Sequence, residues 1–386
     1  MLRQIFKMIW KRKQSNLLTM LEIFISFLIL FALWSLSLYY LNIFSKAKSV
    51  DTDGVLVLYL NYNADSLPNT EQIARQLKSY NEVAYFAFTS MNIPYGGSIS
   101  NNDVGYQDNY LLAEEIKAGF EWPSVLGIKI LKGRAISSQD TIRNIPVLIN
   151  EQLSQSLFGQ HDPLGKRIML GRGESPEQGE VIGVFESFKL RNDYHFSEYC
   201  LIRPVDLAIE KNCLIIKLNK SAQPGFEDQL VKGISAIGSN WFVELKYLSD
   251  MQSDENRKVW LPVLILAIVC CFLLFNVVLG IFGVLFQNIS RRKEEIGIRR
   301  AFGARKSDIF RQFIFEMLAL ASIGILIGLF FAIQFPILGI FDVQPGIYVT
   351  AILWAIFSIY VLVVICALIP SWRASHLLPV NALHDL

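Results

Sequence analysis

The stretch VWLPVLILAIVCCFLLFNVVLGIFGVLF, residues Val259–Phe286, decides the fold class of this chain. It contains no Asp, Glu, Lys or Arg over its whole length. A helix needs roughly 20 mostly apolar residues to cross the hydrocarbon core of a bilayer. The stretch therefore predicts a membrane-spanning helix.

Three further stretches have the same character: Leu17–Leu41, Ile314–Ile333 and Tyr348–Ile369. Their only charged residues are Glu22 and Glu316, each near one end of its stretch. A charge at mid-membrane costs on the order of 3 kcal/mol on insertion scales, and less near the interface. We therefore expect four spanning helices, with both glutamates reaching the interface or pairing with an arginine.

The composition agrees with a membrane protein. The 386 residues are 52% hydrophobic and only 18% charged, against about 25% charged residues in soluble domains. The mean hydropathy is +0.36. The net charge of +2 gives no reason to expect nucleic acid as a partner.

The first apolar stretch is too long for a signal-peptide core of roughly 7–15 residues, so we expect a retained anchor. Residues 1–16 precede it, with Leu2, Ile5, Phe6 and Ile9 at helical spacing beside Lys and Arg. This pattern predicts a short basic amphipathic helix, in contact with lipid at the cytoplasmic face of the membrane.

Lys and Arg are unevenly distributed among the connecting segments. Residues 1–16 hold five of them and residues 287–313 hold eight, whereas the turn 334–347 holds none. Basic loops stay in the cytoplasm. Both termini, including the tail 370–386, are therefore predicted to be cytoplasmic, and residues 42–258 to lie outside.

Residues 42–258 predict an α+β domain. The expected strands are Val55–Leu60, Val83–Thr89, Ile145–Ile149, Val181–Val184, Cys200–Ile202, Leu214–Leu218 and Trp241–Tyr247, and the expected helices are Thr70–Tyr80, Glu151–Leu157 and Glu227–Ile237. The Gly- and Asn-rich segment Tyr95–Asp108 is expected to be an exposed loop. Cys200 and Cys213 sit in neighbouring strands that we expect to form a hairpin. They either form a disulfide outside the cell or stay as free thiols.

Motifs for catalysis are missing from the sequence. It has no G-x-x-x-x-G-K-[ST] loop for ATP phosphates and no G-x-S-x-G nucleophile turn. The four histidines lack metal-ligand spacing, and no acidic residue lies in the middle of a span. We therefore expect neither an enzyme nor a bound metal or cofactor in this chain.

The loop between the second and third spans is more informative. It contains RRKEEIGIRRAFGARK, residues Arg291–Lys306. We expect a charged continuation of the second helix, a break at Gly303 and Ala304, and a new helix capped by Ser307 with Asp308 in its first turn. Positive-inside flanking explains the arginines but not the acidic pair Glu294–Glu295 or the break.

Here the sequence resembles a known family. The run Glu295–Ala304 is similar to the hallmark of the FtsX-like permeases, the four-helix class of ABC transporter membrane subunits. The runs Gln312–Glu316 and Pro370–Leu383 are similar as well. Three runs in residues 42–258 resemble a MacB-type periplasmic core domain: Gly127–Arg134, Leu157–Ile168 and Val181–Val184. The sequence departs from the pattern at Phe302 and along Lys189–Cys200.

The resemblance implies a dimer with a second permease, identical or paralogous, in a bacterial inner membrane. It also implies a dimer of cytoplasmic ABC ATPases that bind ATP and Mg. Since only residues 1–16 precede the first span, the ATPase would be a separate chain. The loop 287–313, hereafter the elbow, would dock on it and pass motion to the periplasmic domain for export or extraction of a substrate.

The resemblance also implies candidate coupling residues. Charge contacts are expected at Glu294, Glu295, Arg299 and Arg300, an apolar face at Ile296, Ala301 and Phe302, and close approach or bending at Gly297, Gly303 and Ala304. An inserted β-rich part, at about residues 133–204, would meet a substrate, a periplasmic adaptor or a substrate protein.

Two other functions compete. One is a signalling subunit that regulates a periplasmic partner such as a cell-wall hydrolase without transport. The other is a membrane-anchored receptor without an ATPase. The elbow motif argues against the receptor, and the MacB-type runs favour export over signalling.

Overall fold

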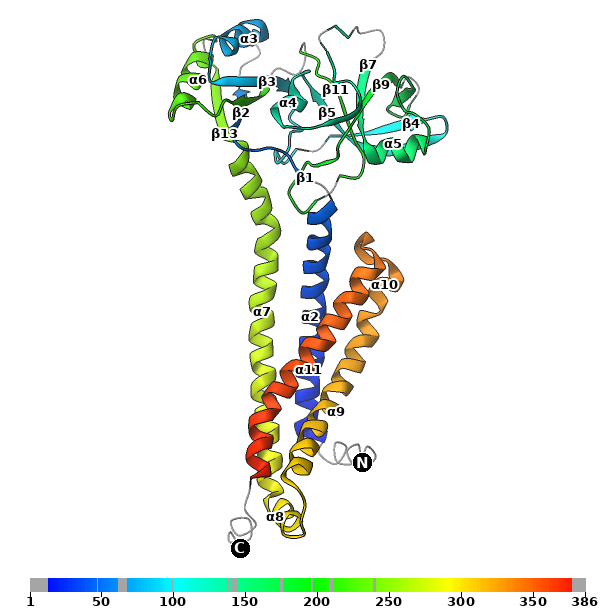
Figure 1. Ribbon diagram of the computed structural model, residues 1–386, viewed down its shortest axis with the longest axis vertical. Helices are drawn as coiled ribbons and strands as arrows, with labels where there is room; N and C mark the ends of the chain where they lie inside the picture. The colour runs from blue at the N-terminus through cyan, green and yellow to red at the C-terminus, as the bar shows by residue number, and fades with distance from the viewer. Residues whose placement is uncertain are drawn as a thin grey trace. The chain divides into compact units, whose positions relative to one another are not determined.

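The computed structural model describes residues 13–46, 48–61, 68–98, 100–137, 139–140, 145–173, 176–195, 197–207, 212–238 and 241–376. The chain divides into two compact units (Figure 1). We call residues 1–40 with 260–386 the helical unit, and residues 41–259 the β-rich unit. Residues 1–12 of the expected amphipathic helix and residues 377–386 of the tail lie outside the described residues.

Long helices form the helical unit. It contains most of α2 (Lys13–Lys46) and of α7 (Leu248–Arg291), whose residues 41–46 and 248–259 belong to the β-rich unit. Its other elements are α8 (Lys293–Ala301), α9 (Lys306–Ala332), α10 (Gln334–Leu338), the short 3-10 helix Ile340–Asp342 and α11 (Pro345–Ser375). Within the described ranges, α2, α7, α9 and α11 are long and apolar enough to cross a membrane. The expectation of four spanning helices is confirmed.

Small residues allow close helix packing in this unit. A Cβ added to Gly328 of α9 would lie 2.4 Å from a ring carbon of Phe27 in α2. Gly324, one turn earlier, faces Ile23 in the same way. Close backbone approach at small residues is how helices associate in lipid, where no hydrophobic driving force acts between them.

The first lobe of the β-rich unit is a four-stranded antiparallel sheet with two helices. Its elements are β2 (Val55–Asn61), α3 (Thr70–Lys78), β3 (Val83–Thr89), β12 (Cys213–Leu218), α6 (Phe226–Ser235) and β13 (Phe242–Tyr247). The strand order is β13-β2-β12-β3, the split βαβ arrangement of ferredoxin-like folds. Leu56 and Leu58, alternate residues of β2, pack with Ile73, Leu77 and Leu230 of the two helices.

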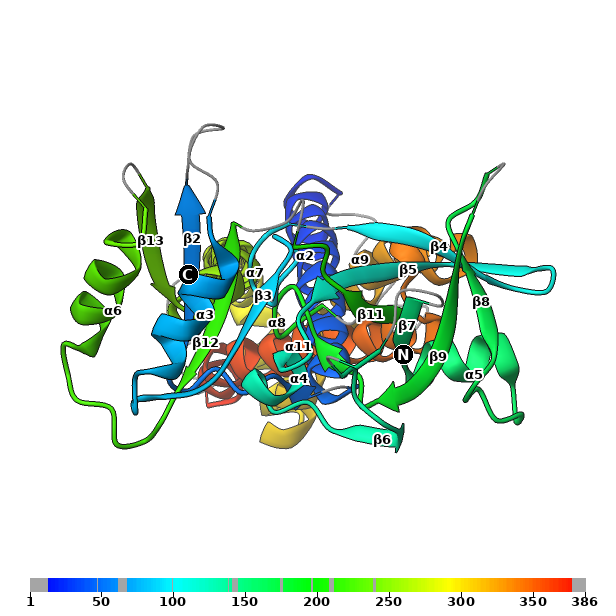
Figure 2. The same ribbon diagram turned by 90° about the horizontal axis from the view of Figure 1, so that it is seen from above.

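The second lobe is a closed ring of six strands inserted between β3 and β12. The strands are β4 (Asn101–Tyr106), β5 (Asn109–Ala118), β7 (Ile145–Asn150), β8 (Arg167–Leu170), β9 (Glu177–Phe185) and β11 (Cys200–Pro204). The pairing order is β11-β7-β9-β8-β4-β5, and β5 returns to β11 in parallel register. The lobe also holds α4 (Trp122–Val125), α5 (Glu151–Phe158) and β6 (Ile130–Gly133), which pairs with β9 (Figure 2).

Two expectations for this lobe are wrong. The segment Tyr95–Asp108 is not an exposed loop, because it contains β4, and Tyr95 is only 1% exposed. Pairing with β5 and β8 outweighs the low strand propensity of its Gly and Asn residues. The ring also extends beyond the insert expected at residues 133–204, because it includes β4 and β5.

The expected hairpin between Cys200 and Cys213 is also wrong. Both thiols are free and buried, and two strands, β5 and β3, lie between β11 and β12. Neighbouring strands are about 4.8 Å apart, so three steps separate the two cysteine strands by roughly 14 Å. A disulfide needs Cα atoms within about 7 Å, so this fold does not allow the pairing.

Candidate functional site

The elbow lies at one end of the helical unit, where α8 connects α7 to α9 (Figure 1). It bends first at Arg292, so the expected helical continuation is a separate helix. It bends again after α8, where Gly303 adopts φ +93°. The Ala304 N–H donates to the Arg299 carbonyl at 3.0 Å. A left-handed glycine with this hydrogen bond is the Schellman ending of a helix, so Gly303 serves the bend as expected.

The start of α9 differs from the expectation. Arg305, with an extended backbone, is the N-cap, and α9 begins at Lys306. The Asp308 carboxylate accepts a hydrogen bond from the Arg305 N–H at 3.3 Å. Ser307 is therefore not the cap, because the chain turns into the helix two residues before it. Asp308 does lie in the first turn, where a negative charge is favourable.

A polar network fixes α8 against α9. The Arg292 guanidinium forms an ion pair with Glu316 at 2.9 Å, and the two side chains are only 10% and 8% exposed. Gln312 donates to the same carboxylate at 3.0 Å. Arg299 of α8 in turn donates to the side-chain amide oxygen Oε1 of Gln312 at 3.0 Å. The expectation that Glu316 pairs with an arginine is confirmed, and the network spans the junction of three helices.

The expected charge contacts therefore divide into two groups. Arg299 also pairs with Glu295 one turn earlier, so these two residues already bind each other and the neighbouring helix. The side chains of Glu294 and Arg300 are outside the described set. A role of any of the four in docking stays a prediction.

The apolar residues of the elbow face two directions. Ile296 is 5% exposed and belongs to the core that includes Ile309 and Phe313, so its place on the outer apolar face is wrong. Phe302 is 89% exposed, and Ala301 is exposed beside it. Ile298, four residues before Phe302, is 48% exposed and was missed. Its signal is the i, i+4 spacing of two large apolar residues in a charged helix.

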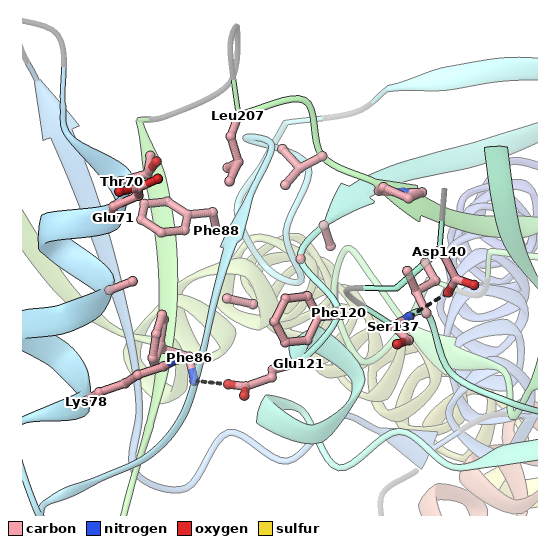
Figure 3. A pocket seen from close by; sticks show the side chains of 17 residues that line it. Thr70, Glu71, Lys78, Phe86, Phe88, Phe120, Glu121, Ser137, Asp140 and Leu207 are labelled. Carbon is pink, nitrogen blue, oxygen red and sulfur yellow. Dashed lines mark hydrogen bonds between the residues drawn. The ribbon is translucent and has the colours of Figure 1, made fainter. Parts of the chain in front are cut away.

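A second candidate site is a groove between the two lobes of the β-rich unit (Figure 3). Its volume is about 420 Å³. The walls come from α3, β3, the end of β5 and the segment after β11, with Phe86, Phe88, Phe120 and Leu207 among the apolar side chains. Phe120 is 50% exposed. The groove is thus an apolar surface open to solvent.

Two carboxylates at the groove, Glu121 and Asp140, are held by local contacts. Glu121 accepts a hydrogen bond from the Phe86 N–H at 3.2 Å. Asp140 accepts one from the Ser137 N–H at 2.7 Å and forms an ion pair with Arg134. The hydrogen bond from Arg134 holds the pKa of Asp140 below its usual range. In the described parts of the chain, no group of three or more His, Cys, Asp and Glu could hold a metal ion.

The fold and the elbow together define a class, a four-helix membrane permease with an inserted α+β domain. Residues 17–231 match the MacB-like periplasmic core domain, and residues 266–379 match the FtsX-like permease C-terminal region. The chain therefore belongs to the FtsX-like ABC transporter permeases with a MacB-like periplasmic core domain.

Several relatives are named macrolide export ATP-binding/permease protein MacB. The one from Nitrobacter winogradskyi is 25% identical over 355 residues, which cover 88% of this chain and 53% of that protein. The one from Vibrio parahaemolyticus is 24% identical over 300 residues, which cover 74% and 45%. This chain thus spans about half the length of these relatives. The crystal structure of the periplasmic region of MacB from Actinobacillus actinomycetemcomitans matches with a TM-score of 0.40 and 14% identity, over 53% of this chain and 92% of that one.

Proposed function

We propose that this chain is a permease subunit in which the elbow binds a cytoplasmic ABC ATPase carried on another chain. The family implies an ATPase partner and dimerisation in general. The observation that carries the proposal is the exposure of Ile298 in α8 and of Phe302 directly after this helix, whose described polar side chains are paired within the protein. A large exposed aromatic on a fixed support is typical of an interface anchor.

The polar network gives this docking a mechanical consequence. Because Arg299 binds Gln312 and Glu316 binds both Gln312 and Arg292, a shift of α8 would act on α9 and on the bend between α7 and α8. An ATPase that binds two positions of α8 with different affinity would shift the equilibrium between them. ATP and Mg would be bound by the ATPase, and the elbow would pass its closure to the spanning helices.

We further propose that both termini and the elbow are cytoplasmic and that the β-rich unit works in the periplasm. The concentration of Lys and Arg in the elbow supports this orientation. The groove between the two lobes is the proposed contact for a substrate or periplasmic partner, because the motion of these lobes would open or close it. Export or extraction of a substrate is the activity this arrangement favours.

Co-purification with the ATPase tests the docking. Replacing Phe302→Ala should weaken ATPase binding by about tenfold, since buried aromatic anchors contribute on the order of 1.4 kcal/mol or more. Phe341→Ala is the matched control, because Phe341 is 80% exposed in the same unit but lies far from the elbow in sequence. If Phe302→Ala and Ile298→Ala both keep full ATPase binding and ATP turnover, the docking proposal fails.

A further inference from the structure

A buried carboxylate lies in the stretch that departs from the family pattern. Asp193 is 8% exposed. Its Oδ1 accepts hydrogen bonds from Ser49 Oγ at 2.5 Å and from the Tyr95 hydroxyl at 3.1 Å. Its Oδ2 accepts from Gln252 Nε2 at 2.9 Å and from Asn256 Nδ2 at 2.7 Å. We call these five residues the clasp.

The clasp residues come from segments far apart in the chain. Ser49 belongs to β1 (Lys48–Ser49), directly after α2 ends at Lys46. Gln252 and Asn256 lie one turn apart in the first turns of α7. The Asp193 N–H also donates to Asn256 Oδ1 at 2.9 Å, so this contact is reciprocal. The clasp therefore joins the chain that leaves α2 to the beginning of α7.

A second contact holds the end of α2. Strand β10 (Phe188–Lys189) pairs in parallel with β1. Lys189 is 2% exposed, donates to the Phe44 carbonyl at 2.9 Å and lies 4.2 Å from the centre of the Phe44 ring. Phe44 is in the last turn of α2, where a cation is favourable. A buried ammonium is costly unless it is well bound, which points to a positional role.

The backbone of Tyr95, a clasp residue, is held in an unfavourable conformation. It has φ +59°, a conformation that a bulky non-glycine residue rarely adopts, and its side chain is buried. Its N–H donates to the Leu190 carbonyl at 2.7 Å while its hydroxyl binds Asp193. Such strain persists only where the surroundings fix it, and it is concentrated at functional positions.

The clasp is not a cation site. A carboxylate has about four acceptor positions, and serine, tyrosine, glutamine and asparagine donors occupy those of Asp193. We propose that Asp193 is a positioning residue that holds the end of α2 and the start of α7 against the second lobe, which contains the six-stranded ring. The consequence for coupling rests on the proposed function, since both helices would then deliver their movement to the β-rich unit together.

Hydrogen–deuterium exchange of the purified full chain tests whether Asp193 holds the end of α2 and the start of α7 in place. Asp193→Ala should raise exchange by about tenfold in residues 44–52 and 248–258, because four donors lose their acceptor. Asp193→Asn keeps the shape and one acceptor oxygen, so it should raise exchange less. Asp254→Asn on the same helix is the control, because the side chain of Asp254 is 71% exposed. Unchanged exchange in either segment of Asp193→Ala would overturn the proposal.

A cross-link distinguishes the loss of the Asp193 contacts from general misfolding of the variant. Thr52 Oγ1 donates to Gln252 Oε1 at 3.2 Å, so these side chains are adjacent. Adding Thr52→Cys and Gln252→Cys to Asp193→Ala and joining the two thiols with a short cleavable bis-maleimide should restore protection of both segments, and cleaving the reagent should remove that protection. If protection does not return although the cross-link forms, Asp193 does not act by holding the two segments together, and the proposal fails.

The same variants distinguish this inference from the proposed function. In a complex with the ATPase, Asp193→Ala should keep ATPase binding but lose the ATP-dependent change of exchange in residues 44–52. If the unmodified chain binds no ATPase, the proposed function fails, while the exchange of the isolated chain still decides the clasp.

Discussion

The elbow and the clasp each depend on a buried carboxylate, Glu316 of α9 beside the elbow and Asp193 in the clasp, but the charge of each carboxylate is neutralised differently. Glu316 faces one buried cation, Arg292, so two charges depend on each other. Asp193 faces four neutral donors from three segments, so no single donor is essential. The elbow is thus sensitive to the loss of either partner, whereas the clasp tolerates the loss of a donor but not of the carboxylate.

The two regions also differ in what they leave exposed. The elbow presents Phe302 and Ile298 to solvent, whereas Asp193, Tyr95 and Lys189 are buried. A region built to bind another protein must keep its anchor residues free, while a region that only joins parts of one chain can bury them. This difference supports the two proposals, partner binding at the elbow and internal transmission at the clasp.

The largest effect is expected from breaking the ion pair between Arg292 of the elbow and Glu316 of α9. Glu316→Ala removes the buried carboxylate that the buried Arg292 guanidinium faces, which should cost about 3–5 kcal/mol of stability. Thermal unfolding of the purified chain would measure this loss. Glu295→Ala is the control, because its pair with Arg299 is half-exposed and should contribute less than about 1 kcal/mol. Equal losses in the two variants would show that burial does not distinguish these pairs.

The next effect is a pH dependence of the clasp. Burial raises the pKa of Asp193, but the four side-chain donors outweigh burial and hold it below the usual carboxyl value. Its stabilisation is therefore present above an ordinary carboxyl pKa of about 3.9 and is lost as pH falls through the lower folded value. At neutral pH we expect Asp193→Asn to cost about 1.5–3 kcal/mol.

Unfolding temperatures of the wild type and Asp193→Asn between pH 2 and 7 would test this dependence. The difference should be constant near neutrality and shrink in acid. If the difference grows as pH falls, the pKa of Asp193 is shifted in the opposite direction. If the difference stays constant from pH 2 to 7, the charge of the carboxylate does not contribute to stability.

A smaller effect is expected at the bend of the elbow. Gly303 has φ +93°, so Gly303→Ala should cost about 1 kcal/mol through backbone strain. Gly283→Ala in α7 is the matched control, because its position is helical and open and the change should be neutral or slightly stabilising. Calorimetry of both variants would compare them. A neutral Gly303→Ala would show that the bend accepts another conformation.

The smallest effect concerns Cys200 and Cys213. They belong to neither the elbow nor the clasp, so their reactivity tests the fold independently of both regions. Burial raises the pKa of Cys213 to about 12, and burial also raises the pKa of Cys200 well above its usual value. Neither thiol should react with iodoacetamide at pH 8 in the folded chain, and a reductant should not change the mass. Mass spectrometry would check both. A mass difference of two hydrogens at this pair would contradict the strand order.

The sequence was sufficient for the elements that depend on local patterns. Hydropathy located the four spanning helices, and short runs rich in apolar, β-branched and aromatic residues located β2, β3 and β12. The bend at Gly303 followed from glycine chemistry. The strand β4 was missed because Gly105 and its Asn neighbours favour turns, and only pairing with distant strands makes them a strand.

Contacts between distant segments could not be predicted in the same way. The order of β11 and β12 in the sheet depends on the whole fold, so adjacency in sequence misled the cysteine pairing. The clasp joins Ser49, Asp193 and Asn256, whose separation in the chain leaves no local pattern. In the elbow, helical spacing could have separated the buried Ile296 from the exposed Ile298, had the direction of the core been known.

The closure of the six-stranded ring has a consequence for how the β-rich unit unfolds and associates. Each ring strand pairs on both sides, so the ring has no free edge at which another chain could add a strand. Opening any one pairing would create two edges at once, which favours an all-or-none opening of the lobe. In the four-stranded sheet, β13 pairs only with β2 among the described strands. Fraying, and any strand exchange with a second copy, should therefore begin at β13.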